Sequence, residues 1–501
     1  MKILRRVLLA VVAVALLALG AFVLLVGPWP TYSDSRYESA SYFKEALAAI
    51  DTAAAQTKSD NDNAPLLAGW AERDITPEPG HPMAGYGGRP NEMRATGIHE
   101  PLFVRALALH DGNETVVFIG SDMLQTLPNL LELIEPRIKE RASLTNRNVM
   151  YTSSHTHCGP GGLAPGLVSD IAFGPYTPEY VELLAERFAE AIVEAVENLA
   201  PARFAHGSVQ VPDYIRNRAR SEGDVDATLH VAVAEHIETE ERLFLARYSA
   251  HATVYSQDML AFNNDYAGAF QRAIKERTGA PLLFMAGAVG SMRPNPPGPP
   301  MPEPWTPELE LAFEHAVEGT LVHQGKITQD EVLRKQEARA EAMGAALADR
   351  LLEAADSLRF ETEVPIATME VFYQPPPAQV RPVSTRWRLS PFAFRLLGVP
   401  TTGRLQAARV GDMLLVGTAS EISGEISAAW QQRALEHGIN LWVTSFSGAY
   451  LGYLSPDRYY DVLGEGMHYN HNYEIGQMNW FGPNQEAFLT DLVEHTFHAL
   501  L

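Results

Sequence analysis

The stretch NVMYTSSHTHCGPGG, residues 148–162, places two histidines and the only cysteine of the chain directly after an apolar, β-prone run. The run from Asn148 to Thr152 predicts a buried strand that gives way to a loop at the histidines. His155 and His157 are one residue apart, and side chains of an extended segment repeat with period two, so both rings can face one ion. The motif alone leaves three readings open: a metal site, a thiol nucleophile at Cys158, or a tight structural loop.

Composition excludes one class of partner. The formal net charge of -22 argues against binding to a nucleic-acid backbone, which needs a basic face, and no basic run is present. The single cysteine also excludes an intrachain disulfide framework, so cysteine pairing says nothing about export.

The N-terminus predicts a membrane segment. Lys2, Arg5 and Arg6 precede an uncharged apolar run over residues 7–27, which is long enough to cross a bilayer as a helix. The run leads into GPWPTYSDSRYE rather than a clear small-x-small cleavage site, which favours an uncleaved anchor. The positive-inside rule then places the rest of the chain outside the cytoplasm. The alternative is a secreted protein whose signal peptide is cleaved near ALGAF.

Strands and helices interleave through the rest of the chain. Predicted strands are TVVFIG, LHVAVA, RLFLARYSA and PLLFMAGAVG, and helices are expected from Pro178 to about Leu199 and from Asp330 to about Leu358. The pattern predicts an α/β fold with a mixed sheet flanked by helices. We expect three segments: an anchor or signal segment at 1–27, a linker with a helix at 28–65, and a hydrolase domain at 66–501.

Seven segments in order resemble the neutral, alkaline, non-lysosomal ceramidase family. Besides the histidine motif, in which the family has serine at the place of Cys158, they are AGWAERDITPEPGHPMAGYGG, GIHEPLFVRALAL, RNRARS, YSAHATVYS, TASEIS and SGAYLGYLSPDRYY. The resemblance implies a ceramidase-like catalytic domain and a zinc hydrolase that cleaves amide bonds. Cys158 is then interpreted as a tolerated replacement rather than a ligand or nucleophile.

Carried over position by position, the resemblance implies that Zn²⁺ is bound by His155, His251, Glu421 and Tyr453. Two neutral nitrogens and two oxygens suit this ion, which polarises carbonyls and lowers the pKa of bound water to about 7. Each residue alone has a structural alternative: a core histidine, a helix N-terminal glutamate or a packed tyrosine. Their joint placement within matching motifs favours the metal site.

The remaining site residues follow from the same motifs. His157 and Arg218 would line the substrate side and stabilise the oxyanion that forms when an amide carbonyl is attacked. The alternative for Arg218 is a structural ion pair with Asp224 or Asp226.

The stretch VGSMRPN departs from the family. Arg293 stands where the family's nucleophilic serine is expected, and Ser291 lies two residues earlier. Water would then attack directly, and Arg293 would place a positive charge near the scissile carbonyl, which favours an anionic substrate over neutral ceramide. The alternative is an Arg293 side chain turned away into a salt bridge.

Four other residues are weaker candidates. His99 and Asp122 fall in matching segments and are expected to support the site indirectly. His468 and His471 lie in an insertion, DVLGEGMHYNHN, and are candidate metal ligands on weaker grounds.

A further stretch, RWRLSPFAFRLLGVP at residues 386–400, mixes arginines with large apolar side chains. Beside an anchor it could lie in a membrane surface and admit a lipid, or it could be core or an oligomer contact.

These observations predict a membrane-anchored, extracytoplasmic zinc amidohydrolase that acts on an N-acylated, sphingolipid-like substrate. One rival keeps the metal and changes the substrate to an ester or a non-lipid molecule. The second rival is a binding protein that kept the fold and lost catalysis together with the serine. The oligomeric state is not predicted.

Overall fold

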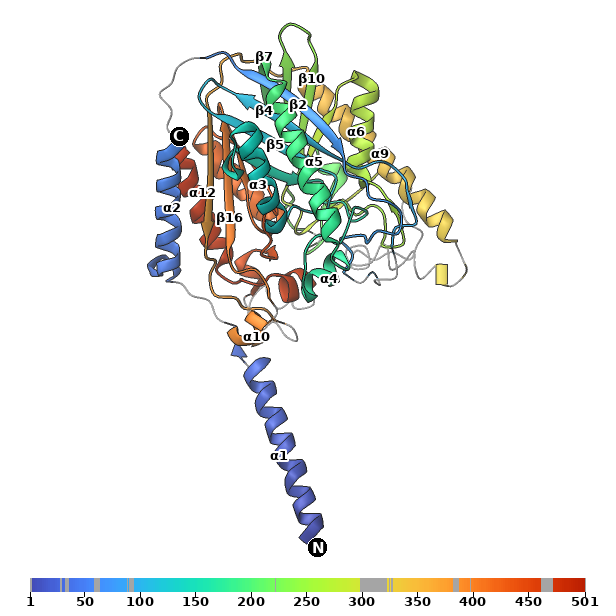
Figure 1. Ribbon diagram of the computed structural model, residues 1–501, viewed down its shortest axis with the longest axis vertical. Helices are drawn as coiled ribbons and strands as arrows, with labels where there is room; N and C mark the ends of the chain where they lie inside the picture. Colours follow the sequence, from blue (N-terminus) through green and yellow to red (C-terminus); the bar gives the residue numbers. More distant parts are fainter. Residues whose placement is uncertain are drawn as a thin grey trace.

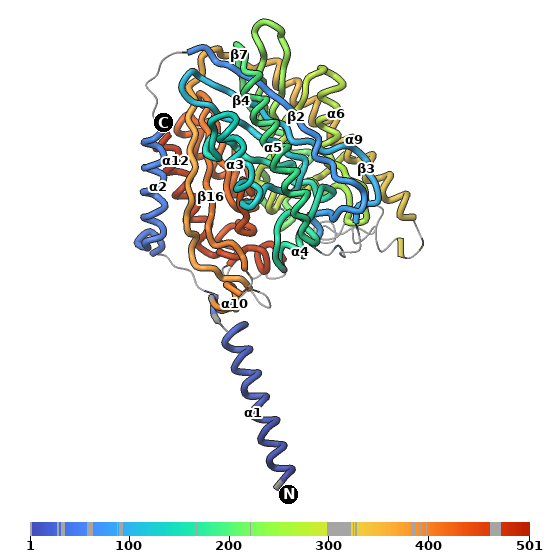
Figure 2. The backbone as a smooth tube through the Cα atoms, in the orientation of Figure 1, coloured from blue at the N-terminus to red at the C-terminus, as the bar shows by residue number. Residues whose placement is uncertain are grey.

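The structure is a computed structural model that describes residues 2–27, 29–31, 36–57, 64–87, 89, 94–220, 222–297, 322–323, 325, 328–381, 387–396, 398–460 and 472–500. Its main body consists of two packed sheets with helices on both outer faces (Figure 1). Helix α1 (Lys2–Leu25) projects away from this body, and the chain can be followed from it in Figure 2.

The larger sheet has eight strands in the order β12-β10-β9-β7-β2-β4-β5-β6. Two neighbouring pairs in it, β5–β6 and β10–β12, are parallel, and the remaining pairs are antiparallel. The strands are β2 (Leu67–Asp74), β4 (Phe103–His110), β5 (Thr115–Ser121), β6 (Val149–Ser153), β7 (Ala200–Gln210), β9 (Thr228–His236), β10 (Arg242–Tyr248) and β12 (Leu282–Ala286).

Four helices cover the outer face of this sheet: α3 (Pro128–Ala142), α5 (Pro178–Glu197), α6 (Asp265–Thr278) and α9 (Gln329–Ala355). α5 begins at Pro178, where a missing N–H costs no hydrogen bond, and it buries a stripe that includes Leu184 and Phe188. Thr328, the N-cap residue of α9, forms a reciprocal capping box with Glu331.

A second sheet, in the order β14-β16-β17-β19, packs against the inner face of the first. Its strands are β14 (Ile366–Tyr373), β16 (Gly403–Val410), β17 (Met413–Gly417) and β19 (Asn440–Thr444). Phe118 of the large sheet and Trp442 of the second sheet belong to the apolar layer between them, and both are fully buried. The outer face of the second sheet is covered by α2 (Ser41–Thr57), α11 (Gly424–Glu436) and α12 (Gln485–Leu500).

The predicted fold class, a mixed α/β sheet flanked by helices, is confirmed. The second sheet was not predicted, because the alternation of apolar residues in a strand shows that a face is buried but not what covers it. β16 and β17 form an antiparallel hairpin that turns at Gly411 and Asp412.

Three parallel strand pairs, β5–β6, β10–β12 and β17–β19, position the candidate site. The large sheet is curled, since β12 at one edge contacts β5 and β6 at the other. Loops that leave the carboxyl ends of these pairs therefore converge, as is usual for sites in α/β proteins.

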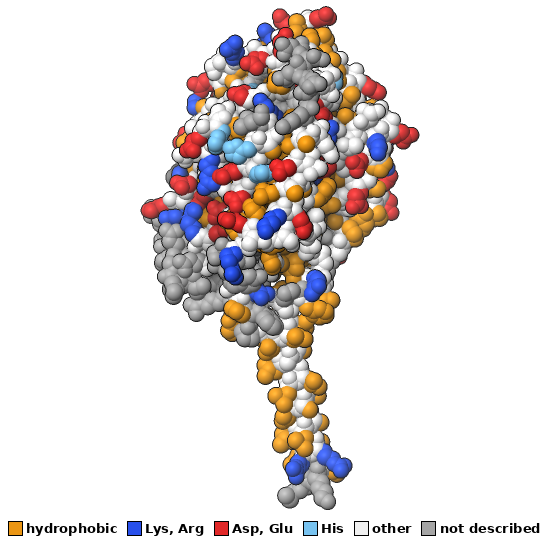
Figure 3. Space-filling view, turned by 90° about the vertical axis from the view of Figure 1, so that its left-hand side faces the viewer, with side chains coloured by type: hydrophobic (Ala, Val, Ile, Leu, Met, Phe, Trp, Pro, Cys, Tyr) orange, Lys and Arg blue, Asp and Glu red, His pale blue; other side chains and the backbone are white. Residues whose placement is uncertain are grey.

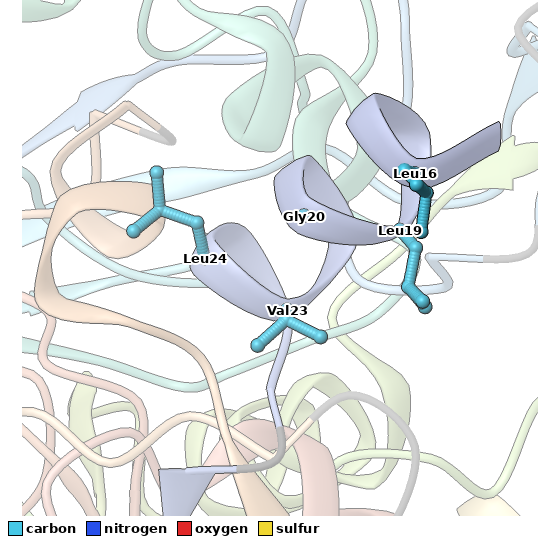
Figure 4. A pocket seen from close by; sticks show the side chains of 5 residues that line it. All are labelled: Leu16, Leu19, Gly20, Val23 and Leu24. Atoms are coloured by element: carbon cyan, nitrogen blue, oxygen red, sulfur yellow. The ribbon is translucent and has the colours of Figure 1, made fainter. Parts of the chain in front are cut away.

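α1 is the helix among the described residues that is long and apolar enough to cross a membrane, over Ile3–Leu25 with mean hydropathy 3.1. None of its apolar window is buried. Figure 4 shows Leu16, Leu19, Val23 and Leu24 projecting from it around Gly20. A signal sequence has the same features, so the helix by itself does not decide between anchor and signal.

Candidate metal centre and active site

His155 reaches the site from a chain reversal that follows β6. The strand ends at Ser153, and His155 adopts a left-handed backbone with φ of 61°, which is uncommon for a residue other than glycine. Its ring stacks on Phe446, with centroids 4.3 Å apart and planes 15° apart. The segment is thus not extended through both histidines, and the turn, rather than strand alternation, directs this ring.

Hydrogen bonds to the backbone orient two of the histidines. Nδ1 of His155 lies 2.8 Å from the carbonyl oxygen of Leu124, and Nδ1 of His251, which follows β10, lies 3.1 Å from that of Val289. A ring nitrogen that faces a carbonyl donates its N–H, so in both rings Nε2 carries the lone pair. Both lone pairs are available to a metal.

Three Nε2 atoms meet at this point. Nε2 of His251 lies 3.1 Å from that of His155 and 3.0 Å from that of His157, and the ligand atoms of all three rings lie within 4.8 Å of one another. Gly85 permits this placement, because a Cβ at its φ of 103° would lie 2.6 Å from Cγ of His157. His157, expected on the substrate side, therefore lies within reach of the same ion as the other two histidines.

Glu421 and Tyr453 come together across the short parallel pair β18 (Glu421–Ile422) and β20 (Tyr453–Leu454). Oε1 of Glu421 accepts a hydrogen bond of 3.0 Å from the hydroxyl of Tyr450. Oε2 lies 3.8 Å from Nε2 of His155 and, within the described part of the chain, is buried without a hydrogen-bond donor. A buried carboxylate oxygen without a donor, close to the lone pair of an imidazole, is typical of a metal ligand.

Arg218 contacts both Tyr453 and Glu474. Its Nη2 donates to the Tyr453 hydroxyl at 3.2 Å, and its Nε donates to the carboxylate of Glu474, which belongs to a π-helix (Glu474–Met478). Its guanidinium also lies 5.8 Å from the ring centroid of Tyr473. The guanidinium is held from three sides.

The alternative partners considered for Arg218 are wrong. Asp226 instead pairs with Arg247 at 2.6 Å in a fully buried ion pair, and the carbonyl of Asp224 accepts from the side chain of Asn217.

Burial sets the protonation of the site. It lowers the pKa of His155 to about 3 and that of His251 well below its usual range, and the charge of Arg218 acts in the same direction. Burial also raises the pKa of Glu421 to about 7, against the opposing effects of the Tyr453 hydroxyl and the charge of Arg218. Both imidazoles are therefore uncharged at neutral pH and can act as metal ligands.

The donor set fits a divalent ion such as Zn²⁺. Tetrahedral zinc with bonds of about 2.0–2.1 Å separates its ligand atoms by about 3.3 Å. The distances of 3.1 Å between the His155 and His251 Nε2 atoms and 3.8 Å from His155 Nε2 to Glu421 Oε2 bracket this value. The assignment of individual ligands stays a prediction.

Arg293 lies on β13 (Met292–Pro294), which pairs with β8 (Ile215–Asn217). Its neighbour Met292 accepts the backbone N–H of His251 at 3.2 Å, so the main chain at Arg293 borders the site. No described contact links its guanidinium to the three histidines, and its catalytic role stays a prediction. The hydroxyl of Ser291 is buried against that of Ser423 at 2.6 Å.

The remaining candidates lie around this centre. Cys158 is buried, and the metal-binding group found among the described residues does not include it. Asp122 pairs with Arg105 at 3.0 Å and accepts from Asn264, whose side chain also bonds Ser154, the neighbour of His155. His99 lies 3.7 Å from Glu337, and the candidates His468 and His471 lie outside the described residues.

Comparison with known proteins supports the ceramidase resemblance. Residues 66–227 match the model of the family described as neutral/alkaline non-lysosomal ceramidase, N-terminal. The crystal structure of neutral ceramidase from Pseudomonas aeruginosa superposes with a TM-score of 0.68 at 18% identity, covering 87% of this chain and 74% of that chain. This chain has the neutral ceramidase fold. The predicted resemblance is confirmed.

Sequence similarity is confined to part of the ceramidase relatives. The neutral ceramidase of Drosophila melanogaster is 29% identical over 191 residues, and that of Mycobacterium tuberculosis is 28% identical over 153 residues. These matches cover 34% and 29% of this chain, and they span only 27% and 24% of the relatives' own lengths.

Sequence reasoning missed three residues of this site: Phe446, Tyr450 and Glu474. Tyr450 lies inside a matched motif, so its spacing from Tyr453 was a usable signal. Glu474 follows an insertion and carries no motif, and Phe446 is one of many aromatic residues, so neither had a sequence signal.

Proposed function

We propose that this chain is a membrane-anchored, zinc-dependent hydrolase that cleaves the amide bond of an N-acylated, sphingolipid-like substrate. The observation that carries the proposal is that the Nε2 atoms of neutral His155 and His251 meet at 3.1 Å, with the unsatisfied Oε2 of Glu421 3.8 Å from that of His155. The ceramidase fold supports the choice of an amide bond, and the named activity of the relatives supports a ceramide-like substrate.

The proposed metal ligands are His155, His251, Glu421 and Tyr453. Zinc bound there would polarise the scissile carbonyl and make water a better nucleophile at neutral pH. Backbone carbonyls hold both histidines in the ligand tautomer. Tyr450 holds the second oxygen of Glu421, which leaves one carboxylate oxygen for the ion.

Arg218 and His157 are proposed to bind the substrate carbonyl. Arg218 keeps its charge because Glu474 is its buried partner, and charged donors fixed in a water-poor site stabilise a developing oxyanion strongly. Alternatively, His157 binds the zinc directly, since its Nε2 lies beside that of His251. Zinc affinity measured for His157→Ala separates these two roles.

Water is proposed as the nucleophile. The resemblance aligns Arg293 with the family's nucleophilic serine, and the hydroxyl of Ser291 bonds that of Ser423. No acyl-enzyme would then form, and an anionic group near the scissile bond would be favoured by Arg293.

The test combines metal analysis with turnover. Full-length protein purified without chelator should hold one zinc per chain and hydrolyse some members of a panel of N-acyl lipids, N-acyl amino acids and matched esters. Turnover of esters alone would favour the rival ester hydrolase. Stoichiometric zinc without turnover would favour a binding protein, and absence of zinc would refute the metal site.

The anchor is part of the proposal, with the catalytic domain outside the cytoplasm. The apolar run of α1 and the basic residues in its first turns support this topology. A C-terminal topology reporter checks the orientation. Recovery of a soluble form beginning between residues 21 and 32 would show that α1 is a cleaved signal.

A further inference from the structure

A small apolar surface lies beside the end of α1. Trp387, Phe392 and Leu396 are 49%, 55% and 68% exposed, and we call these three side chains the α10 patch. They lie on β15 (Trp387–Arg388) and on α10 (Pro391–Leu396). Phe394, also on α10, is instead buried and packs edge-on against Phe481 at 5.8 Å. One side chain thus fixes the short helix to the body while its neighbours remain outside.

The α10 patch is tied to the carboxyl end of α1. The carbonyl of Leu25, the last residue of α1, accepts the backbone N–H of Ser390 at 3.1 Å. Nε of Arg388 donates to the carbonyl of Pro30 at 3.1 Å, and β1 (Trp29–Pro30) pairs with β15. Figure 1 shows α10 immediately beyond the end of α1. The depth of the patch along the axis of α1 is therefore fixed.

The dimensions of α1 place this end at a bilayer surface. A helix of 24 residues is about 36 Å long, and the hydrocarbon core of a bilayer is about 30 Å thick. If α1 crosses the core, the residues bonded to Leu25 lie at the level of the headgroups. Tryptophan is enriched at that level, and the arginine side chains that accompany the patch, Arg388 and Arg395, can lay their apolar stems there and keep their charges in water. Figure 3 shows hydrophobic and basic side chains together around the upper end of α1.

The α10 patch is also connected to the wall of the active site. Buried Arg381 donates to the carbonyls of Ile475 and Gly476 in the π-helix that carries Glu474. The neighbouring Val380 accepts the backbone N–H of Leu389 at 2.7 Å, beside the patch. The same π-helix therefore contacts both the segment that supports the patch and, through Glu474, Arg218.

We infer that the α10 patch is a second membrane contact, which lies in the headgroup layer of the bilayer that α1 crosses. It holds the domain at a fixed distance from the lipid surface, with the π-helix wall of the site on the membrane side. The inference rests on the membrane-anchored part of the proposed function. A lipid surface is favoured over a second copy of the chain because the patch is bonded to the end of a membrane-length apolar helix.

Site-specific fluorescence in vesicles tests the inference. The full chain carries one cysteine, and burial raises the pKa of Cys158 to about 12, so an added exposed cysteine can be labelled selectively. Leu396→Cys and Phe392→Cys report on the patch. Leu435→Cys is the matched control, because Leu435 is 66% exposed on α11, as Leu396 is on α10. It lies near the C-terminus, since the ring of the nearby His437 packs on that of His498. Leu17→Cys, within α1, reports on the anchor.

Each labelled protein is reconstituted in phosphatidylcholine vesicles that contain nitroxide-labelled lipids. We expect headgroup-level nitroxides to quench the labels at 392 and 396 at least twofold more than the label at 435, and deep nitroxides to quench the label at 17. Equal quenching at 396 and 435, with strong quenching at 17, would overturn the α10 contact and leave the anchor intact. A label at 17 unaffected by lipid would refute the anchor as well.

Self-association is tested separately. A water-soluble quencher reports whether the label at 396 is shielded. If the shielding increases with protein concentration and does not depend on lipid, a second copy of the chain covers the patch. That result would overturn the inference.

Discussion

Glu421 and Tyr453 are register partners in a two-residue parallel strand pair, so their side chains leave neighbouring backbones in the same direction. Each is also tied to a further residue: Glu421 to Tyr450, and Tyr453 to Arg218. The pair therefore joins the proposed metal ligands to the proposed substrate-binding arginine. A change at either residue should affect metal binding and chemistry together, whereas a change at Glu474 should affect only the arginine.

Glu421→Gln should weaken zinc binding. The substitution keeps the shape of the side chain but removes the charge that the unsatisfied Oε2 offers. We expect the zinc affinity to fall by at least about 10–100-fold, because loss of a residue that only hydrogen-bonds a metal ligand already costs roughly that much. Competition with a chromogenic chelator measures it. Glu353→Gln, whose side chain is 69% exposed on α9, is a surface control. Unchanged affinity in Glu421→Gln would exclude Glu421 from the ligand set.

Glu474→Gln should lower turnover without loss of metal. Hydrogen bonds to charged groups contribute about 1.5–3 kcal/mol, so kcat/KM on an N-acyl substrate should fall roughly 10–150-fold. The fall should appear mainly in kcat if Arg218 acts on the transition state, and Glu474→Asp should recover part of it. Glu186→Gln removes an exposed ion-pair carboxylate and should change neither kcat/KM nor the zinc content. A loss of zinc in Glu474→Gln would contradict a role confined to Arg218.

Cys158→Ser should keep zinc and activity nearly unchanged. The thiol is buried, and burial raises its pKa to about 12, so it is a poor thiolate ligand or nucleophile at neutral pH. Native protein should also resist thiol reagents until it is unfolded. Metal analysis of the variant decides the point, since a clear loss of zinc would make Cys158 a ligand.

Arg293→Ser should shift substrate preference. Removing a permanent charge beside the site should lower activity on anionic N-acyl substrates relative to neutral ceramide, by about tenfold for each 1.4 kcal/mol of lost interaction. The ratio of the two kcat/KM values is the measurement. An unchanged ratio would mean that the guanidinium does not reach the substrate. A covalent intermediate trapped on Ser291 in the wild type would refute attack by water.

Asp457 should make stability depend on pH. Burial and the neighbouring Glu486 raise its pKa from 3.8 to about 6. The folded state then holds more protons than the unfolded state between these values, so the stability contribution is present below about pH 4 and is lost as pH rises through 6. The loss is at most about 3 kcal/mol. Thermal unfolding from pH 4 to 8 should show a steeper decline in the wild type than in Asp457→Asn, which keeps an acceptor for the N–H groups of Asn484 and Ala487. Parallel profiles would contradict the prediction.

The sequence by itself determined the residue types of the site and the class of the fold. Local patterns suffice for this, because apolar runs such as Val149 to Tyr151 specify buried strands, and ordered motifs identify His155, His251, Glu421 and Tyr453 as candidates. It also specified the apolar N-terminal helix, since length and hydropathy are local properties.

Only the tertiary structure decided how these residues meet. His155 turns into the site through a left-handed backbone and a stacking contact with Phe446, which spacing in the sequence does not encode. The curled sheet brings the loops after β6 and β10 together, although these strands are far apart in strand order. Arg218 found its partner in Glu474 rather than in the nearby Asp224 or Asp226, because a buried charge pairs with the carboxylate that packing brings to it. Long-range packing, not local pattern, selected that partner.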